Sequence, residues 1–108
     1  MASKRTLALD VTPEVRAAVY KRDSFGYPPY PCCVVCGKAG QHDIAHYISR
    51  AHGGLAILKN LVNLCRYCHS VMDQGKPYQR EIIRKEVKEY LQYRHKNWDE
   101  EKLIYKRE

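Results

Sequence analysis

Two C-x-x-C pairs constrain this chain more than any other feature of its sequence. Cys33 and Cys36 form the first pair, and Cys65 and Cys68 form the second. Four thiolates in two such pairs are a common ligand set for one tetrahedral zinc ion. A zinc ion bound here would bring two distant parts of the chain together. Residues held near it are therefore candidates for a shared site.

The length and charge of the chain limit the number of domains and the kinds of binding partner. A chain of 108 residues predicts one domain, residues 1–108, whose small core gains stability from a structural metal. The formal net charge of +7 favours a polyanionic partner, most commonly nucleic acid. The alternative is that the excess charge only keeps a small protein in solution.

The N-terminal residues contain no apolar run typical of a signal peptide, and no stretch approaches the ~18 apolar residues of a membrane span. We therefore expect a cytoplasmic protein, in a bacterium or a phage-infected host, with no membrane partner. Cysteines in such a compartment are reduced, which favours metal binding over disulfides. Cys32 is expected to be a packed or loosely exposed thiol rather than a fifth ligand.

The first predicted helix begins at Thr12 and Pro13, which are typical of an N-cap and a first helical position. Val15, Ala18 and Val19 follow with the spacing of a buried helical stripe. The basic residues of this helix lie off the stripe, where they either contact phosphates or are simply solvated: Arg16, Lys21 and Arg22.

The segment 24–31 contains three prolines and is predicted to be a loop. Residues 42–49 are rich in strand formers, and residues 60–64 predict a returning antiparallel strand. A helix is expected at 66–73. The order is strand, long loop, strand, helix.

A long amphipathic helix is predicted from residue 78 to about 95, with Trp98 anchoring its end on the core. Asp99 is placed to cap a short final helix carrying Leu103. Helices are therefore expected at both ends of the central strands.

Three polar residues lie on the predicted strand and the helix behind it. His69 and Asp73 are four residues apart, so they share one helix face and provide part of a divalent-metal site. A lone strand histidine such as His46 is usually a core residue that bonds a carbonyl. The zinc clamp, however, would press His69 against the same hairpin, which favours a shared site.

At this point the residues resemble a known family, the HNH endonucleases of the His-Me finger (ββα-metal) superfamily. The resemblance covers roughly residues 15–75 and is closest to small, zinc-stapled members that phages often carry. It implies an α+β fold with a ββα-metal core at about 42–74, an N-terminal helix and a C-terminal helical extension at about 77–108. Its motifs are Arg22-Asp23, Cys33-x-x-Cys36, Ala45-His46-Tyr47-Ile48, Gly53-Gly54, Asn60-Leu61-Val62 and Cys65-x-x-Cys68-His69.

The resemblance implies a DNA endonuclease that hydrolyses phosphodiester bonds with one divalent metal, Mg²⁺ or Mn²⁺. His46 would be the general base. His69 would bind the metal with Asp73, and Asn60 would brace the loop that orients the base. Asn63 is a competing candidate for that asparagine, with a structural strand role as its other interpretation.

One position departs from the family. Many members carry Asp or His directly before the general base as a metal ligand, and this chain has Ala45. Asp43 has the same strand parity, about 6–7 Å along the strand. It either replaces the missing ligand, directly or through a water, or is a solvent-facing acid.

DNA would be held mainly through phosphates by Arg50, Lys59 and Arg66. No separate recognition module is evident, so sequence preference is expected to be loose unless a partner, such as a phage packaging or recombination protein, supplies it. Two alternatives are a catalytically impaired, zinc-stapled DNA-binding module and a protein-interaction zinc domain. His46 and His69 in family register argue against the last of these.

Overall fold

The computed structural model describes residues 3–106, so the extreme ends of the expected 1–108 domain, residues 1–2 and 107–108, lie outside it. The helices are α1 (Lys4–Leu9), α2 (Pro13–Arg22), α3 (Arg66–Gln74) and α4 (Pro77–Arg94), with short 3₁₀ helices η1 (Arg50–His52), η2 (Leu58–Asn60) and η3 (Glu100–Leu103). The strands are β1 (Ser24–Phe25), β2 (Tyr30–Pro31), β3 (Asp43–His46) and β4 (Leu61–Leu64). The fold class is α+β, as predicted.

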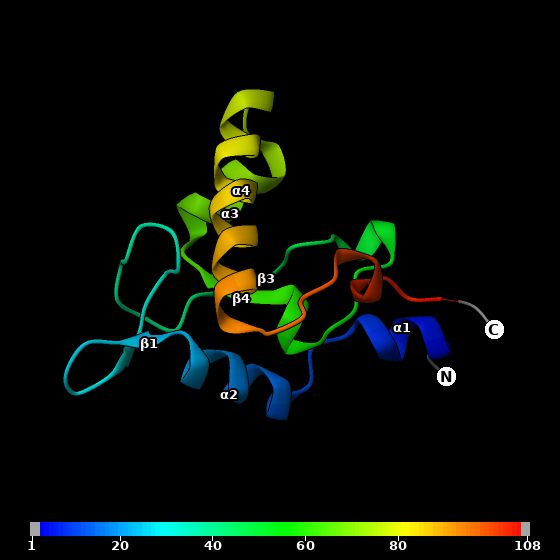
Figure 1. The fold of residues 1–108 in the computed structure, drawn as a ribbon, viewed down its shortest axis with the longest axis horizontal. Helices are drawn as coiled ribbons and strands as arrows, with labels where there is room; N and C mark the ends of the chain where they lie inside the picture. Colours follow the sequence, from blue (N-terminus) through cyan, green and yellow to red (C-terminus); the bar gives the residue numbers. More distant parts are fainter. Residues whose placement is uncertain (1–2, 107–108) are drawn as a thin grey trace.

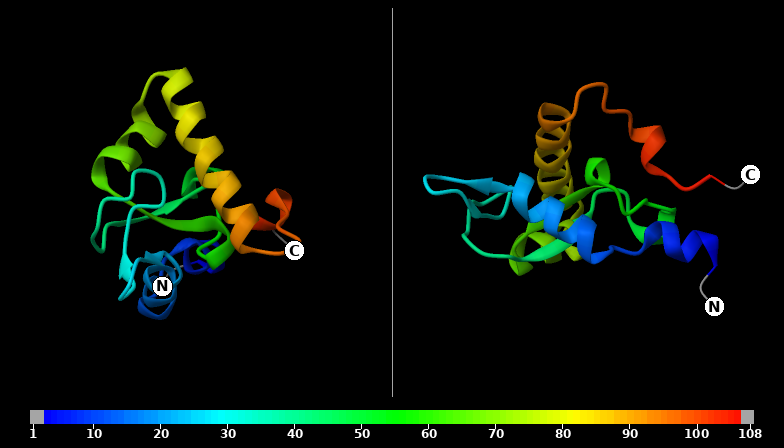
Figure 2. Two further views of the ribbon diagram at one scale, coloured as in Figure 1. Left: turned by 60° about the vertical axis from the view of Figure 1, so that its left-hand side comes forward. Right: turned by 90° about the horizontal axis from the view of Figure 1, so that it is seen from below.

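The β3–β4 hairpin lies at the centre of the molecule. The strands pair antiparallel, with Asp43 opposite Leu64 and His46 opposite Leu61, and every residue of β4 is buried. On one side of the hairpin, Ala45 and Leu64 pack with the buried face of α3 and α4. On the other side, Leu61 packs with Val19 of α2. The hairpin therefore lies between the α3–α4 pair and α2 (Figures 1 and 2).

The predicted start of α2 is confirmed. Thr12 is the N-cap, its side-chain oxygen accepts a hydrogen bond from the Val15 N–H at 3.2 Å, and Pro13 is the first helical residue. Val19 is fully buried. This face fixes α2 against the hairpin.

A buried acid joins three elements of the core. Asp23, just after α2, is fully buried and accepts hydrogen bonds from Arg22 Nε at 2.7 Å and from the backbone N–H of Asn63 in β4 at 2.9 Å. The Tyr90 hydroxyl of α4 also donates to it. Because a buried carboxylate is costly unless it is paired, this network favours one arrangement of α2, β4 and α4. The expectation that Arg22 either contacts phosphates or is simply solvated is wrong, since its side chain is only 8% exposed.

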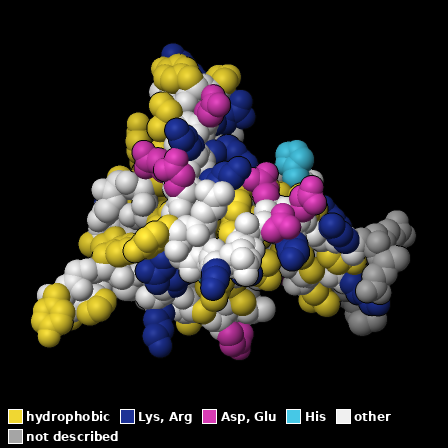
Figure 3. All heavy atoms as spheres, in the orientation of Figure 1, with side chains coloured by type: hydrophobic (Ala, Val, Ile, Leu, Met, Phe, Trp, Pro, Cys, Tyr) yellow, Lys and Arg dark blue, Asp and Glu magenta, His cyan; other side chains and the backbone are white. Residues whose placement is uncertain are grey.

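Other predictions need smaller corrections. Segment 24–31 is not simply a loop, because Ser24–Phe25 and Tyr30–Pro31 pair as a short hairpin whose tip carries exposed hydrophobic side chains (Figure 3, lower left). The first central strand is shorter than predicted, since β3 ends at His46. The long helix and the short final helix are confirmed, with Asp99 accepting a hydrogen bond from the Glu101 N–H. Within residues 3–106, no helix has the length and apolar composition needed to cross a membrane.

Candidate functional site

The four predicted cysteine ligands converge. The sulfur atoms of Cys33, Cys36, Cys65 and Cys68 all lie within 4.8 Å of one another, and those of Cys36 and Cys65 are 3.6 Å apart. Four sulfurs around a tetrahedral zinc with bonds of about 2.3 Å would be separated by about 3.8 Å. The donor set and its spacing therefore fit a zinc ion.

Backbone N–H groups favour the thiolate at Cys33, whereas burial and the neighbouring cysteines raise the pKa of Cys68 in the absence of a metal. Burial raises the pKa of Cys33, but the backbone N–H groups of Cys36, Cys65 and Val35 more than offset it and lower that pKa to about 7. The N–H of Cys68 donates to the Cys65 sulfur at 3.5 Å. Backbone donors directed at sulfur stabilise the charged form that binds metal. Cys32 stands apart, with its sulfur donating to the Tyr30 carbonyl at 3.2 Å.

His46, at the end of β3, is held by the N-terminal segment. Its Nε2 lies 3.1 Å from the Leu9 carbonyl oxygen. A carbonyl only accepts, so Nε2 carries the proton and Nδ1 keeps its lone pair. Burial lowers the pKa of His46, opposed by the Leu9 carbonyl and supported by the positive charge of Arg50. The ring is therefore neutral near pH 7.

His69, in the first turns of α3, lies between two carboxylates. Its Nδ1 is 2.9 Å from Oδ2 of Asp43 on β3, and its Nε2 is 3.2 Å from Oδ2 of Asp73 one turn later on α3. Arg66 approaches the same Asp43 oxygen at 3.4 Å. Asp43 therefore faces the helix rather than open solvent. Within residues 3–106, however, the thiols are the only group of three or more His, Cys, Asp or Glu residues whose ligand atoms converge.

Asn60 closes the loop that follows β3. Its Oδ1 accepts from the Ile48 N–H at 2.8 Å, and its Nδ2 donates to the carbonyls of Ile48 and Leu55 at 3.1 and 2.9 Å. The side chain is fully buried. Asn63 is also buried, but it contacts Cys32, Gly40 and His42 instead. The two asparagines thus brace different segments.

A pocket of about 700 Å³ brings the two histidines together. His46, His69 and Asp73 line it, as do Asp10 and Arg50. The Arg50 guanidinium forms an ion pair with Asp10 and donates to the Leu9 carbonyl at 2.8 Å. Of the three predicted phosphate ligands, Arg50 alone lines this pocket.

The other two predicted phosphate ligands lie on the surface. Arg66 projects beside Asp43 with its side chain 83% exposed. Lys59 is exposed on η2, where its carbonyl accepts from the Trp98 indole N–H at 2.7 Å. Trp98 thereby anchors the end of α4 on the core, as predicted.

Sequence reasoning missed the contribution of Leu9 and Asp10. Leu9 acts through its backbone carbonyl, which no side-chain pattern reveals. Asp10 follows α1, a six-residue helix that was not predicted. The acid at Asp10 was visible in the sequence, but nothing local indicated that it would reach Arg50.

The fold and the site together define a small α+β protein with four clustered thiols that are placed to bind a metal and a pocket shared by a strand histidine and a helix histidine. Residues 33–71 match the family model described as HNH endonuclease, in agreement with the resemblance seen in the sequence. The match includes all four clustered cysteines and the residues His46, Asn60 and His69. No curated protein and no solved structure matches the chain.

Proposed function

We propose that this protein is a metal-dependent endonuclease that hydrolyses phosphodiester bonds in DNA. The observation that carries the proposal is the shared pocket, in which His46 from β3 and His69 from α3 face one volume with Asp73. A neutral imidazole that shares a pocket with an imidazole and a carboxylate suited to a divalent metal can support metal-assisted hydrolysis. The net charge of +7 suits a polyanionic substrate.

His46 is the general base of the proposed reaction. The Leu9 carbonyl holds the proton on Nε2, which leaves Nδ1 to take a proton from the attacking water. The lowered pKa keeps the ring ready to accept that proton near pH 7.

His69 and Asp73 would hold the catalytic cation. Adjacent ligands around an octahedral ion with bonds of about 2.1 Å are about 3 Å apart, close to the 3.2 Å between Nε2 of His69 and Oδ2 of Asp73. Mg²⁺ and Mn²⁺ accept such donors, and water and a phosphate oxygen would fill the other positions. When bound, the ion supplies charge stabilisation for the scissile phosphate and the leaving oxygen.

Asp43 fits the role of the carboxylate that orients His69. Metal-binding histidines usually donate their second ring N–H to a carboxylate or a carbonyl. Nδ1 of His69 is 2.9 Å from Asp43, while Nε2 faces Asp73. Asp43 would thus act on the metal through His69, with Arg66 beside it balancing the negative charge.

A second candidate function follows from Ala45. This residue occupies the position of the usual extra metal ligand, has no donor atom and is 1% exposed within the core. His69 and Asp73 are then the only donors proposed for direct contact with the cation. A zinc-stapled DNA-binding module without catalysis is therefore the alternative.

The phosphates of DNA would contact the exposed cations around the pocket, chiefly Arg50 and Arg66, with Lys59 further along the surface. Such contacts hold a duplex without reading its sequence. Zinc at the thiol cluster is the proposed structural metal. From the family resemblance, we also propose that a phage packaging or recombination protein is a partner.

A nicking assay on supercoiled plasmid distinguishes the nuclease from the DNA-binding module. We expect zinc-loaded wild type to nick it with Mg²⁺ or Mn²⁺ and to stop when EDTA is added. His46→Ala should lower the rate by about 100-fold or more, as expected for loss of a general base, while the variant keeps its zinc and still unfolds in one thermal transition. Equal rates in both proteins would overturn the role of His46. A zinc-loaded wild type that is inactive with every divalent metal but binds DNA would favour the alternative.

A further inference from the structure

The pocket shared by the two histidines lies between two further hollows, with each of which it shares lining residues. A second pocket of about 620 Å³, here called the α2 arm, shares Val11 and Arg16 with it. A third pocket of about 840 Å³, here called the α4 arm, shares Ser49 and Asp73 with it. Because each arm has lining residues in common with the central pocket, the three hollows adjoin one another, and together they are called the groove here.

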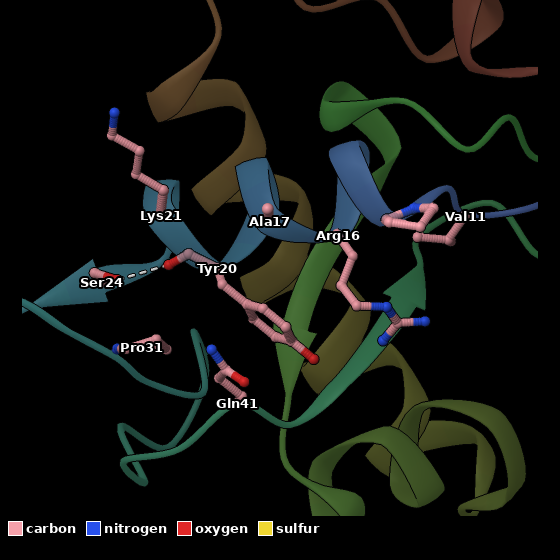
Figure 4. A pocket seen from close by; sticks show the side chains of 9 residues that line it. Val11, Arg16, Ala17, Tyr20, Lys21, Ser24, Pro31 and Gln41 are labelled. Atoms are coloured by element: carbon pink, nitrogen blue, oxygen red, sulfur yellow. Dashed lines mark hydrogen bonds between the residues drawn. The ribbon is translucent and has the colours of Figure 1, made fainter.

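The α2 arm is lined by cations and no carboxylate. Arg16 and Lys21 of α2 contribute the charge, and Tyr20, Pro31 and Gln41 contribute the floor. Figure 4 shows Arg16 extending beside Val11, at the end of the arm that adjoins the histidine pocket. No ion pair between described residues includes Arg16 or Lys21. Their charge is therefore available to a ligand.

The α4 arm has an excess of cations over carboxylates. Arg80, Arg84, Lys85 and Lys88 of α4 line it, against two acids. Two of these cations have internal roles. Arg84 lies 4.5 Å from the centre of the Tyr47 ring and donates to the Tyr47 carbonyl, and Lys88 pairs with Glu100. Arg80 and Lys85 are exposed, and Lys85 has only a 4.0 Å contact with Glu89.

We infer that one DNA duplex lies along this groove, with its phosphates on both sides of the cut contacting the two arms. The cations of both arms complement the charge of DNA, and both arms adjoin the candidate site, so the placement depends on the proposed function only for the position of the cut. The longest dimension of the molecule, 43 Å, covers about 12 base pairs at ~3.4 Å each. Both arms therefore lie within reach of one short duplex.

Binding to a labelled duplex of about 20 base pairs, without divalent metal and in the His46→Ala background, tests the inference. One double variant, Arg16→Gln with Lys21→Gln, removes charge from the α2 arm. A second, Arg80→Gln with Lys85→Gln, removes charge from the α4 arm. The matched control, Lys96→Gln with Lys102→Gln, changes two exposed cations that line none of the three pockets.

Each arm variant should bind roughly tenfold more weakly near 0.1 M salt and lower the slope of log Kd against log salt by about 2, at about 0.9 per phosphate contact. The control should keep the parent slope. An unchanged slope in either arm variant overturns the inference, and so does a parent protein that does not bind DNA. Thermal unfolding and zinc content verify that each variant is folded.

Failure of this inference and failure of the nuclease proposal give different results. Binding through both arms by a wild type that never nicks plasmid supports the groove and overturns catalysis. Nicking by wild type, with arm variants that bind like the control, supports catalysis and overturns the groove.

Discussion

His46 is positioned by a backbone carbonyl from a different part of the chain. The Leu9 oxygen fixes the tautomer at 3.1 Å, and the Arg50 guanidinium bonds the same oxygen at 2.8 Å. One carbonyl thus sets the position of the proton on the His46 ring and the position of the Arg50 cation in the same pocket. The segment before α2 is therefore part of the proposed active site, although it lies outside the matched residues 33–71.

The lowered pKa of His46 predicts the pH dependence of nicking. A general base must be deprotonated, so the rate falls as pH drops through the pKa of His46. Because burial and Arg50 move that pKa below 6.5, we expect the acid limb of the rate profile to have its midpoint below pH 6.5. The nicking rate should be measured from about pH 5 to about pH 8.

His46→Ala is the control for this profile, since its residual activity should lack that limb. A midpoint clearly above pH 6.5 would contradict the assignment. Stability shifts in the same direction. The unfolded chain binds the proton more readily than the folded chain, so folding is weakened as pH falls below about 6.5.

At the scale of elements, the loop between β3 and β4 depends on one close approach. A Cβ at Gly54 would lie 1.6 Å from the Ile48 carbonyl oxygen and 2.9 Å from Asn60 Nδ2. The same two residues exchange the hydrogen bonds that close the loop. Only glycine at position 54 allows the chain to pass this closely.

Gly54→Ala should therefore destabilise the zinc-loaded protein by about 3 kcal/mol, the upper part of the usual cost of overpacking. Gly26→Ala is the comparison, because its Cβ meets only the Pro28 oxygen at 3.8 Å and its cost comes from a φ of +94°, about 1 kcal/mol. Urea unfolding of both variants measures the difference. Equal losses would show that the loop yields to the added methyl group.

The sequence predicted the elements whose signals are local. Thr12 and Pro13 mark the start of α2, and apolar periodicity marks α4, because capping and helical spacing are properties of neighbouring residues. The β1–β2 hairpin was not predicted, because its three prolines indicate a loop. Two strands of two residues each need few backbone N–H donors, so they can pair despite these prolines. α1 was missed because a six-residue helix carries almost no periodicity.

The candidate site was partly predictable for the same reason. His69 and Asp73 share a helix face by spacing alone, and the structure places them 3.2 Å apart. The contact of Asp43 with His69 depends on the crossing of β3 and α3, so spacing left its direction open. The Leu9 contact depends on tertiary packing of α1 and carries no sequence signal.

At the scale of the whole molecule, the thiol cluster ties the two halves of the fold together. Cys33 and Cys36 precede the hairpin, whereas Cys65 and Cys68 begin α3, so a bound ion fixes the segment before β3 to the helix that carries His69. Cys33, Cys65 and Cys68 also belong to the main core. If an ion is bound there, we expect its loss to loosen the core and to free the helix that carries His69 from the segment before β3.

Removal of the metal should unfold the protein. Structural zinc contributes about 10–16 kcal/mol in small domains, comparable with or above the entire stability of about 5–15 kcal/mol typical of a folded protein. We expect one zinc per chain by elemental analysis, and loss of the thermal transition near neutral pH once a strong chelator has removed it. Readdition of zinc should restore both the transition and plasmid nicking.

Cysteine variants make this prediction specific. Cys68→Ser should lose zinc and the cooperative transition, since its sulfur lies within the cluster. Cys32→Ser should keep both, because that thiol contacts the Tyr30 carbonyl instead of the other four sulfurs. An apo protein with an unchanged melting temperature would mean that packing around β4 and the Asp23 network holds the fold without the metal. Zinc loss from Cys32→Ser would instead mean that the fifth cysteine belongs to the ligand set.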